Sequence, residues 1–192
     1  NTNATFLQNI NVGVAITAGK LGIGFTDANV KVGNTALDSL TTGNYNTAVG
    51  NAALTANTTG NNNTSVGNES LDANTTGASN TAIGAAALGV NSTGDNNVAV
   101  GALALDANTT ASANTAVGRA SLSANTTGAT NTALGFNALN SNTTASNNTA
   151  VGSEALTLNT TGTKNTAVGA YALEDNTTAD NNTALGYRAA RN

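Results

Sequence analysis

The feature that most constrains the fold is a 17-residue unit that repeats without insertion or deletion from residue 29 onwards. We number the unit from the Asn of the motif N-T-A-V-G, and its consensus is N-T-A-V-G-x-x-A-L-x-x-N-T-T-G-x-x. The Gly at position 5 recurs in ten copies, from Gly33 to Gly186. A fixed period of this kind indicates a repeat architecture in which each unit packs against its neighbours in the sequence.

The composition of the unit favours strands over helices. A repeat of two packed helices needs about 30 residues or more, and Gly, Asn and Thr are poor helix formers. The segment N-T-A-V has the length of a short strand, and the following Gly can bend the chain. Stacked turns about 4.8 Å apart would pair their backbones. The sequence therefore predicts an all-β fold, a parallel β-solenoid of nine to ten 17-residue coils over residues 29–192.

Three nearly constant positions predict ladders of identical side chains along the stack. A register slip of one residue would move an apolar side chain into water, which explains the strict period. We expect the Val-type residues of position 4 and the Leu of position 9 to form the core, and the Asn amides of position 12 to hydrogen-bond from coil to coil. The ladder residues singled out are Val49, Val66, Ile83, Val100, Leu54, Leu71, Leu88, Leu105, Asn57, Asn74, Asn108 and Asn125.

One Val and one Leu per coil make a thin core, because each buried side chain contributes only about 1.5–3 kcal/mol. We therefore expect a second buried surface, most simply in a trimer of parallel solenoids. Variable positions 6, 7, 10, 11, 16 and 17 hold nearly all the charge of the array and are expected at solvent-facing corners. The unusual residues there are partner-contact candidates, with plain surface variation as the alternative: Arg119, Phe136, Tyr171, Tyr187 and Arg188.

Residues 1–28 do not follow the repeat. Apolar residues alternate with polar or small ones from Ile10 to Ile16 and again from Leu21 to Phe25. This pattern predicts a β-hairpin, which would either cap the first coil or dock to a neighbouring subunit. The domains are thus an N-terminal hairpin segment, 1–28, and a repeat array, 29–192.

The residue types exclude most catalytic chemistry. The chain has no His and no Cys, so it lacks the nucleophile pairs of hydrolases and the usual zinc ligands. Its few carboxylates are scattered, so we expect no enzyme activity, no cofactor and no metal site. A net charge of −4 argues against nucleic acid, and no apolar run approaches the roughly 20 residues of a membrane helix.

Position 12 also matches the acceptor pattern N-x-[ST] in eight coils. The alternatives are a glycosylated stalk and an internal Asn ladder. We favour the ladder, because glycans about 4.8 Å apart would collide.

Three stretches carry a resemblance to a known family: "NTAIGAAAL" (80–88), "NVAVGALAL" (97–105) and "NTAVGRASL" (114–122). They resemble the head repeats of trimeric autotransporter adhesins, and the 17-residue form with "NTTG" is also similar to phage tail-fibre-like repeats. The adhesin heads are left-handed parallel β-rolls that assemble as trimers, so the resemblance implies a homotrimer at a cell or virion surface.

These observations together predict a non-enzymatic, extracellular fibre segment that presents a multivalent surface to a receptor or glycan. Two alternatives stay open. The chain could be the subunit of a self-assembling filament joined head to tail. It could also be an ice-binding β-solenoid, because in "NTT" Asn and Thr stand at i and i+2 and would share one face of a strand.

Overall fold

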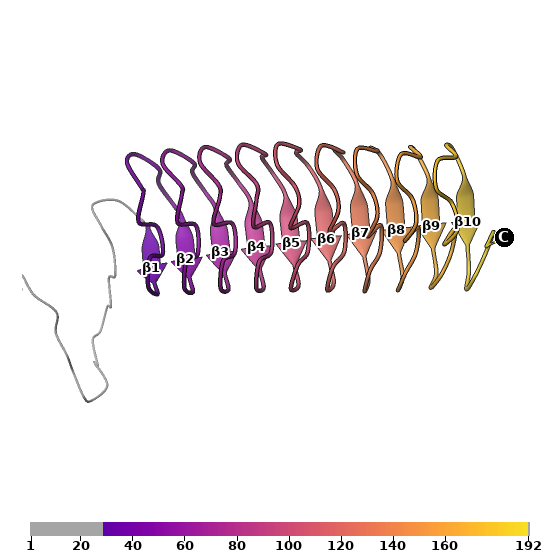
Figure 1. Ribbon diagram of the computed structural model, residues 1–192, viewed down its shortest axis with the longest axis horizontal. Coiled ribbons are helices and arrows are strands. Elements are labelled where there is room, and N and C mark those ends of the chain that lie inside the picture. The colour runs from indigo at the N-terminus through magenta and orange to yellow at the C-terminus, as the bar shows by residue number, and fades with distance from the viewer. Residues whose placement is uncertain (1–28, 192) are drawn as a thin grey trace, which may run out of the picture.

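The computed structural model describes residues 29–191, and the predicted N-terminal hairpin lies outside this range. The described chain winds into a stack of coils, of which coil 1 begins at Asn29 and coil 10 at Asn182. Each coil contributes one short strand, covering positions 2–4, to a single parallel sheet that runs the length of the stack (Figure 1). The strands are β1 (Val30–Val32), β2 (Thr47–Val49), β3 (Thr64–Val66), β4 (Thr81–Ile83), β5 (Val98–Val100), β6 (Thr115–Val117), β7 (Thr132–Leu134), β8 (Thr149–Val151), β9 (Thr166–Val168) and β10 (Thr183–Leu185).

Every strand pairs with the next in a register of one full repeat. Thr64 of β3 pairs with Thr81 of β4, and Val66 pairs with Ile83. The hydrogen bonds continue outside the strands, as the N–H of Leu54 donates to the carbonyl of Ser70 at 3.0 Å. The predicted all-β parallel solenoid with a 17-residue coil is confirmed.

Small residues and one Leu per coil fill the interior. In the inner coils the Ala or Ser of positions 3 and 8 and the Leu of position 9 are buried, and Leu54 to Leu156 are fully inaccessible to solvent in seven successive coils. Position 9 has a left-handed backbone, with a φ of 55° at Leu105. This bend lets two consecutive side chains, at positions 8 and 9, point inward, which the simple alternation of a strand would forbid.

The expectation that position 4 belongs to the core is wrong. Position 3 points inward, so positions 2 and 4 of the same strand point outward. Ile83 and Leu134 are 40% and 46% exposed, and the Val residues of the inner strands β2 to β9 are half-buried. Val49, Val66, Ile83 and Val100 do stack in register, but on the outer side of the sheet.

Two internal Asn ladders run along the stack. At position 12, the Asn74 amide donates to Asn57 Oδ1 at 2.9 Å and to the Gly77 carbonyl at 3.0 Å. The same coil-to-coil bond joins Asn125 to Asn108 at 3.2 Å, and all four of these Asn side chains are fully buried. Buried amides satisfied in this way stabilise one register, because a slip would leave them unpaired.

The second ladder, at position 1, was not predicted. The backbone N–H of Asn97 donates to Asn80 Oδ1 at 2.9 Å, and the Asn97 side chain donates to the Ala111 carbonyl at 2.9 Å. The Asn is present in all ten coils. This constant Asn is the feature of the sequence from which the second ladder could have been predicted.

The Gly of position 5 makes the turn after each strand. At Gly118 φ is +129°, and a Cβ there would collide with the backbone of Gly135 in the next coil. Only glycine combines this conformation with so close an approach of two backbones.

The core assignment predicts different effects for two Leu residues in coil 5. Leu105 is fully buried and Leu103 is 39% exposed, while both have left-handed φ values, 55° and 59°. We expect Leu105→Ala to lower the free energy of unfolding by about 2–5 kcal/mol, because it leaves a cavity in an unbroken Leu column. Leu103→Ala should cost less than about 1 kcal/mol.

Thermal and denaturant unfolding of both variants gives the comparison. Since the two sites share residue type and backbone conformation, strain and propensity cancel between them. Equal losses in the two variants would contradict an inward Leu column.

Candidate functional site: an aromatic corner

The unusual corner residues follow directly from the turn at position 5. After each Gly, positions 6 and 7 form a corner on which side chains of successive coils stand one above the next. The backbone holds this alignment: the N–H of Tyr171 donates to the Ser153 carbonyl at 3.0 Å, and that of Arg188 to the Ala170 carbonyl at 2.9 Å. The position-7 residues have left-handed φ values, 60° at Tyr171 and 53° at Arg188.

Three of the five predicted contact residues meet in coils 9 and 10. The rings of Tyr171 and Tyr187 lie edge to face, with centroids 6.1 Å apart. The Arg188 guanidinium carbon lies 5.1 Å from the Tyr187 centroid and 5.5 Å from that of Tyr171. Edge-to-face rings and cation–π contacts fix the orientation of side chains that would otherwise move freely.

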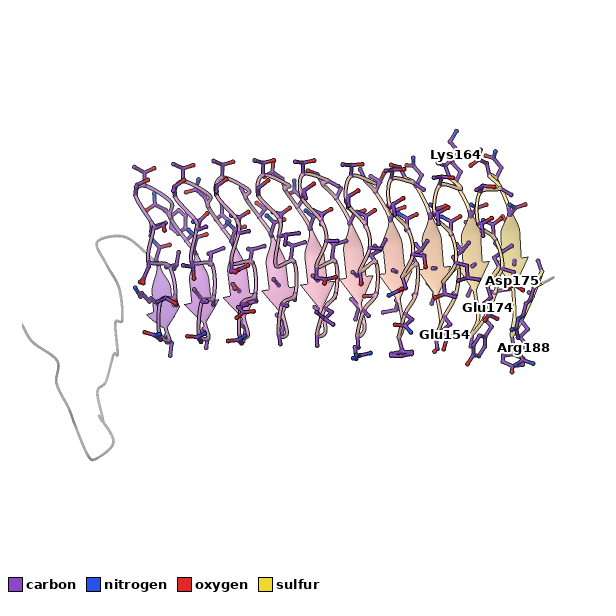
Figure 2. All side chains as sticks on the ribbon, in the orientation of Figure 1. Glu154, Lys164, Glu174, Asp175 and Arg188 are labelled. Atoms are coloured by element: carbon purple, nitrogen blue, oxygen red, sulfur yellow. The ribbon has the colours of Figure 1, made fainter. Side chains whose placement is uncertain are left out.

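The other two predicted residues pair on the same corner in coils 6 and 7. The Arg119 guanidinium carbon of coil 6 lies 6.0 Å from the Phe136 ring centroid of coil 7. Glu154 of coil 8 stands between this pair and the tyrosines, and Figure 2 shows Glu154 and Arg188 projecting from the same edge of the stack. We call Arg119, Phe136, Glu154, Tyr171, Tyr187 and Arg188 the aromatic corner.

Sequence reasoning missed two members of this region. Arg191 contacts the Tyr171 ring at 5.9 Å and forms an ion pair with Glu174, with 2.6 Å between Nε and Oε2. Glu154 was recognised only as a charged corner residue. Glu154 lies at position 7, as Tyr171 and Arg188 do, and Arg191 follows Arg188 by three residues. Their closeness in the repeat to the aromatic positions is the signal that could have identified them.

The character of the corner changes along the stack. In coils 1–3 it is an exposed amide ladder, in which Asn51 donates to Asn68 Oδ1 at 3.1 Å. Coils 4 and 5 have Ala85 and Ala102 at position 6. Glu69 is the one charged residue on the corner in coils 1–5. The aromatic residues begin at Phe136, which is paired with Arg119, and Phe136 and Tyr187 are 44% and 66% exposed. The aromatic groups of this corner are thus concentrated on the second half of the stack.

The other sequence-based site hypotheses find less support in the geometry. Position 12 is buried, so the N-x-[ST] asparagines have no accessible amide in the folded inner coils. The Thr of position 14 is exposed in every coil that has it, so Asn and Thr of "NTT" do not share a surface. The chain bends at positions 13 and 14 instead of forming a strand, and the alternation rule fails there.

Within residues 29–191, no three His, Cys, Asp or Glu side chains lie close enough to hold a metal ion. The same range contains no helix of the length and apolarity that a membrane span requires. A hollow at coils 9 and 10 is lined by Leu173, Asp175, Asn176, Ala179, Asn182 and Ala190. Four of these residues occupy core positions 9, 12 and 1, so the hollow opens onto the last described layer of the interior.

Two carboxyl groups at position 10, those of Asp72 and Asp106, have pKa values raised above the ordinary value. Burial raises the pKa of Asp106, while hydrogen bonds from Ser123 and the backbone oppose the shift. Burial and then the nearby Glu69 charge raise the pKa of Asp72.

In coil 7, position 10 is an Asn, whose neutral side chain can donate a hydrogen bond. The Asn140 amide donates to the Ala120 carbonyl of the preceding coil at 3.0 Å. At the same position of coil 5, the ionised Asp106 carboxylate has no proton to donate, and its Oδ1 is buried with no hydrogen-bond partner.

We expect Asp106→Asn to raise the melting temperature at neutral pH. A carboxyl with a raised pKa binds its proton more tightly in the folded state, so the ionised form destabilises the fold, and this penalty disappears as the pH falls through the folded-state pKa. The advantage of the Asn variant should therefore vanish at about pH 3, below the ordinary Asp pKa.

Asp180 provides a control of opposite sign. Hydrogen bonds from Thr163 hold the pKa of its carboxyl below the ordinary value. Asp180→Asn should therefore lower the melting temperature at neutral pH and lose this effect in acid. A lower melting temperature for Asp106→Asn at neutral pH would show that its carboxylate is well solvated.

No protein-family model, curated protein or solved structure matches the chain. The β-solenoid with its tandem repeat is established by the structure, and the similarity to adhesin heads and tail-fibre repeats rests on the motifs quoted above.

Proposed function

We propose that this chain is a non-enzymatic segment of an extracellular fibre, at a cell or virion surface, that presents the aromatic corner to a receptor or glycan. The observation that carries the proposal is the alignment of exposed Phe, Tyr and Arg side chains along one edge of a stiff stack. Tyr and Arg are enriched at the energetic centres of protein interfaces, and aromatic rings offer large contact areas with few rotatable bonds.

The stack suits the role of a rigid spacer. Each coil is hydrogen-bonded to the next through strands, turns and internal Asn side chains, and every step spans one full repeat. No long loop interrupts residues 29–191, because the repeat leaves no insertion for one. A rod of ten coils would hold its corner roughly 45 Å along the axis in a fixed orientation.

Assembly into a homotrimer would multiply the binding surface. Three parallel copies present three aromatic corners at once, and linked sites bind a surface more tightly than one site alone. The narrow interior supports association, since Ala and one Leu per coil supply little apolar burial. The motif resemblance to trimeric adhesin heads adds to this argument.

The test measures binding of the wild-type chain and two Tyr→Ala variants to a defined glycan array and to immobilised surface proteins. Tyr187→Ala removes a ring from the corner, and Tyr45→Ala removes one from position 17 of coil 1. The two side chains are equally exposed, at 66%. We expect Tyr187→Ala to weaken binding roughly tenfold or more, as at an interface hot spot, and Tyr45→Ala to leave it unchanged.

Equal loss in both variants, or no partner bound by the wild type, would contradict the role of the corner. Sedimentation equilibrium on the same samples tests the assembly. A mass of three chains of 18.7 kDa is expected. A monomer would remove the trimer from the proposal, and long polymers would favour the filament.

A further inference from the structure

The outward side of the sheet is a second surface with a regular composition. We call it the outer sheet face, and define it as the side chains of positions 2 and 4 in β1 to β10. Position 2 is Thr in eight strands and Val in two, while position 4 is Val, Ile or Leu in all ten. The face therefore consists of one row of hydroxyl and methyl groups beside one row of methyl groups.

The hydroxyls of this face have no protein partner. Within residues 29–191, no hydrogen bond is made by the side chain of any position-2 Thr, such as Thr115 or Thr132. The contrast is position 13, where the Thr109 hydroxyl donates to the Thr126 carbonyl of the next coil at 3.2 Å. The Thr hydroxyls at position 2 are thus left to hydrogen-bond with water.

The groups are held on a rigid two-dimensional grid. Thr115 pairs with Thr132, and Val117 with Leu134, in the register that links all the strands. Most of these side chains are β-branched and have restricted χ1 angles. Strand geometry places neighbouring rungs about 4.8 Å apart and positions 2 and 4 roughly 6.6 Å apart.

The face carries no charge. The charged residues of the array lie at the corners, apart from Lys31 at position 3 of coil 1, and none occupies positions 2 or 4. An ionised group would hold its own hydration shell and disturb an ordered water lattice. Methyl groups can be surrounded by ordered water, and hydroxyl groups can hydrogen-bond with that water, so neither disturbs the lattice. The charge pattern therefore fits a neutral, periodic partner.

The size of the face argues against a second copy as its occupant. Two rows over ten rungs, at about 4.8 by 6.6 Å for each side chain, cover roughly 630 Å², whereas each partner in a standard protein interface contributes about 800 Å². A protein partner would have to extend beyond this face to reach the standard area. An ice surface needs no such extension, because its lattice repeats wherever the grid does.

We propose that the outer sheet face binds ice. The assignment does not depend on the aromatic corner or on the fibre. It also differs from the Asn and Thr array expected at "NTT", since the Asn side chains of that array are internal. The Thr residues of position 14 form only a single row, whereas the outer sheet face supplies two rows in register.

The test compares two Thr→Lys variants of coil 6 in the full chain. Thr115 lies at position 2 on the outer sheet face, and Thr127 lies at position 14, exposed and without a side-chain hydrogen bond. Thermal hysteresis and the fraction of protein incorporated into a slowly growing ice crystal are measured for the wild type and both variants. We expect activity in the wild type, its loss in Thr115→Lys, and no change in Thr127→Lys.

Melting temperature and mass are recorded for each sample, and Thr115→Tyr replaces Thr115→Lys if the latter does not fold. Absence of hysteresis and of incorporation in the wild type would overturn the proposal. Loss of activity in Thr127→Lys alone would also overturn it, in favour of position 14. A wild-type oligomer that binds no ice and dissociates on Thr115→Lys would assign the face to a second copy of the chain.

Discussion

The structure depends on the coil-to-coil hydrogen bonds that join equivalent positions of successive repeats. These bonds run along the whole stack and pair nearly every part of each coil with its neighbours. Side-chain amides extend the pattern into the interior, where Asn97 accepts the N–H of Asn114 in the next coil and donates to the Ala111 carbonyl of its own coil. Because the Asn side chains of position 12 bond to the Asn of the neighbouring coil, and those of position 1 to backbone groups fixed by the register, the register and the sequence period are the same constraint.

The interior is unusual because polar ladders occupy it alongside a single column of large apolar side chains. A buried amide costs free energy unless its donors and acceptors are paired. Here the stack supplies those partners from identical residues, so the cost is offset in every coil except at the ends. The backbone also accepts left-handed conformations at Leu105, Leu103 and their equivalents, each unfavourable by roughly 1–2 kcal/mol. Repeated inter-coil bonds hold these residues in place.

Much of the fold could be predicted from the period alone. The coil length, the parallel sheet and the columns of Leu105 and Asn108 follow from constant residues at a fixed spacing. The outward direction of Val100 did not follow, because apolar character was taken to mean burial, although a β-branched residue also suits the outer side of a strand. Leu105 was expected in the core, but the inward direction of both Ala104 and Leu105 could not be derived, since sequence alone does not reveal a left-handed residue that breaks the alternation.

The candidate site was predictable in its members and less so in its geometry. Phe136 and Tyr187 were identified because large or aromatic residues are rare at variable positions, and their alignment follows from the repeat. The contacts of Arg188 with two rings, and the part played by Arg191, depend on side-chain conformations that the spacing does not specify. The outer sheet face became visible only when the direction of each strand residue was known.

Deleting a whole coil tests the dependence on register most directly. Removal of residues 97–113 takes out one full repeat and leaves every later column in place, whereas removal of residues 97–112 shifts all of them by one. We predict that the first variant melts cooperatively, close to the wild type, with a rod shorter by about 4.8 Å in small-angle scattering. The second should melt at a markedly lower temperature, because Leu and Asn columns no longer meet across the junction. Similar melting of the two deletions would contradict a fold held together by its 17-residue register.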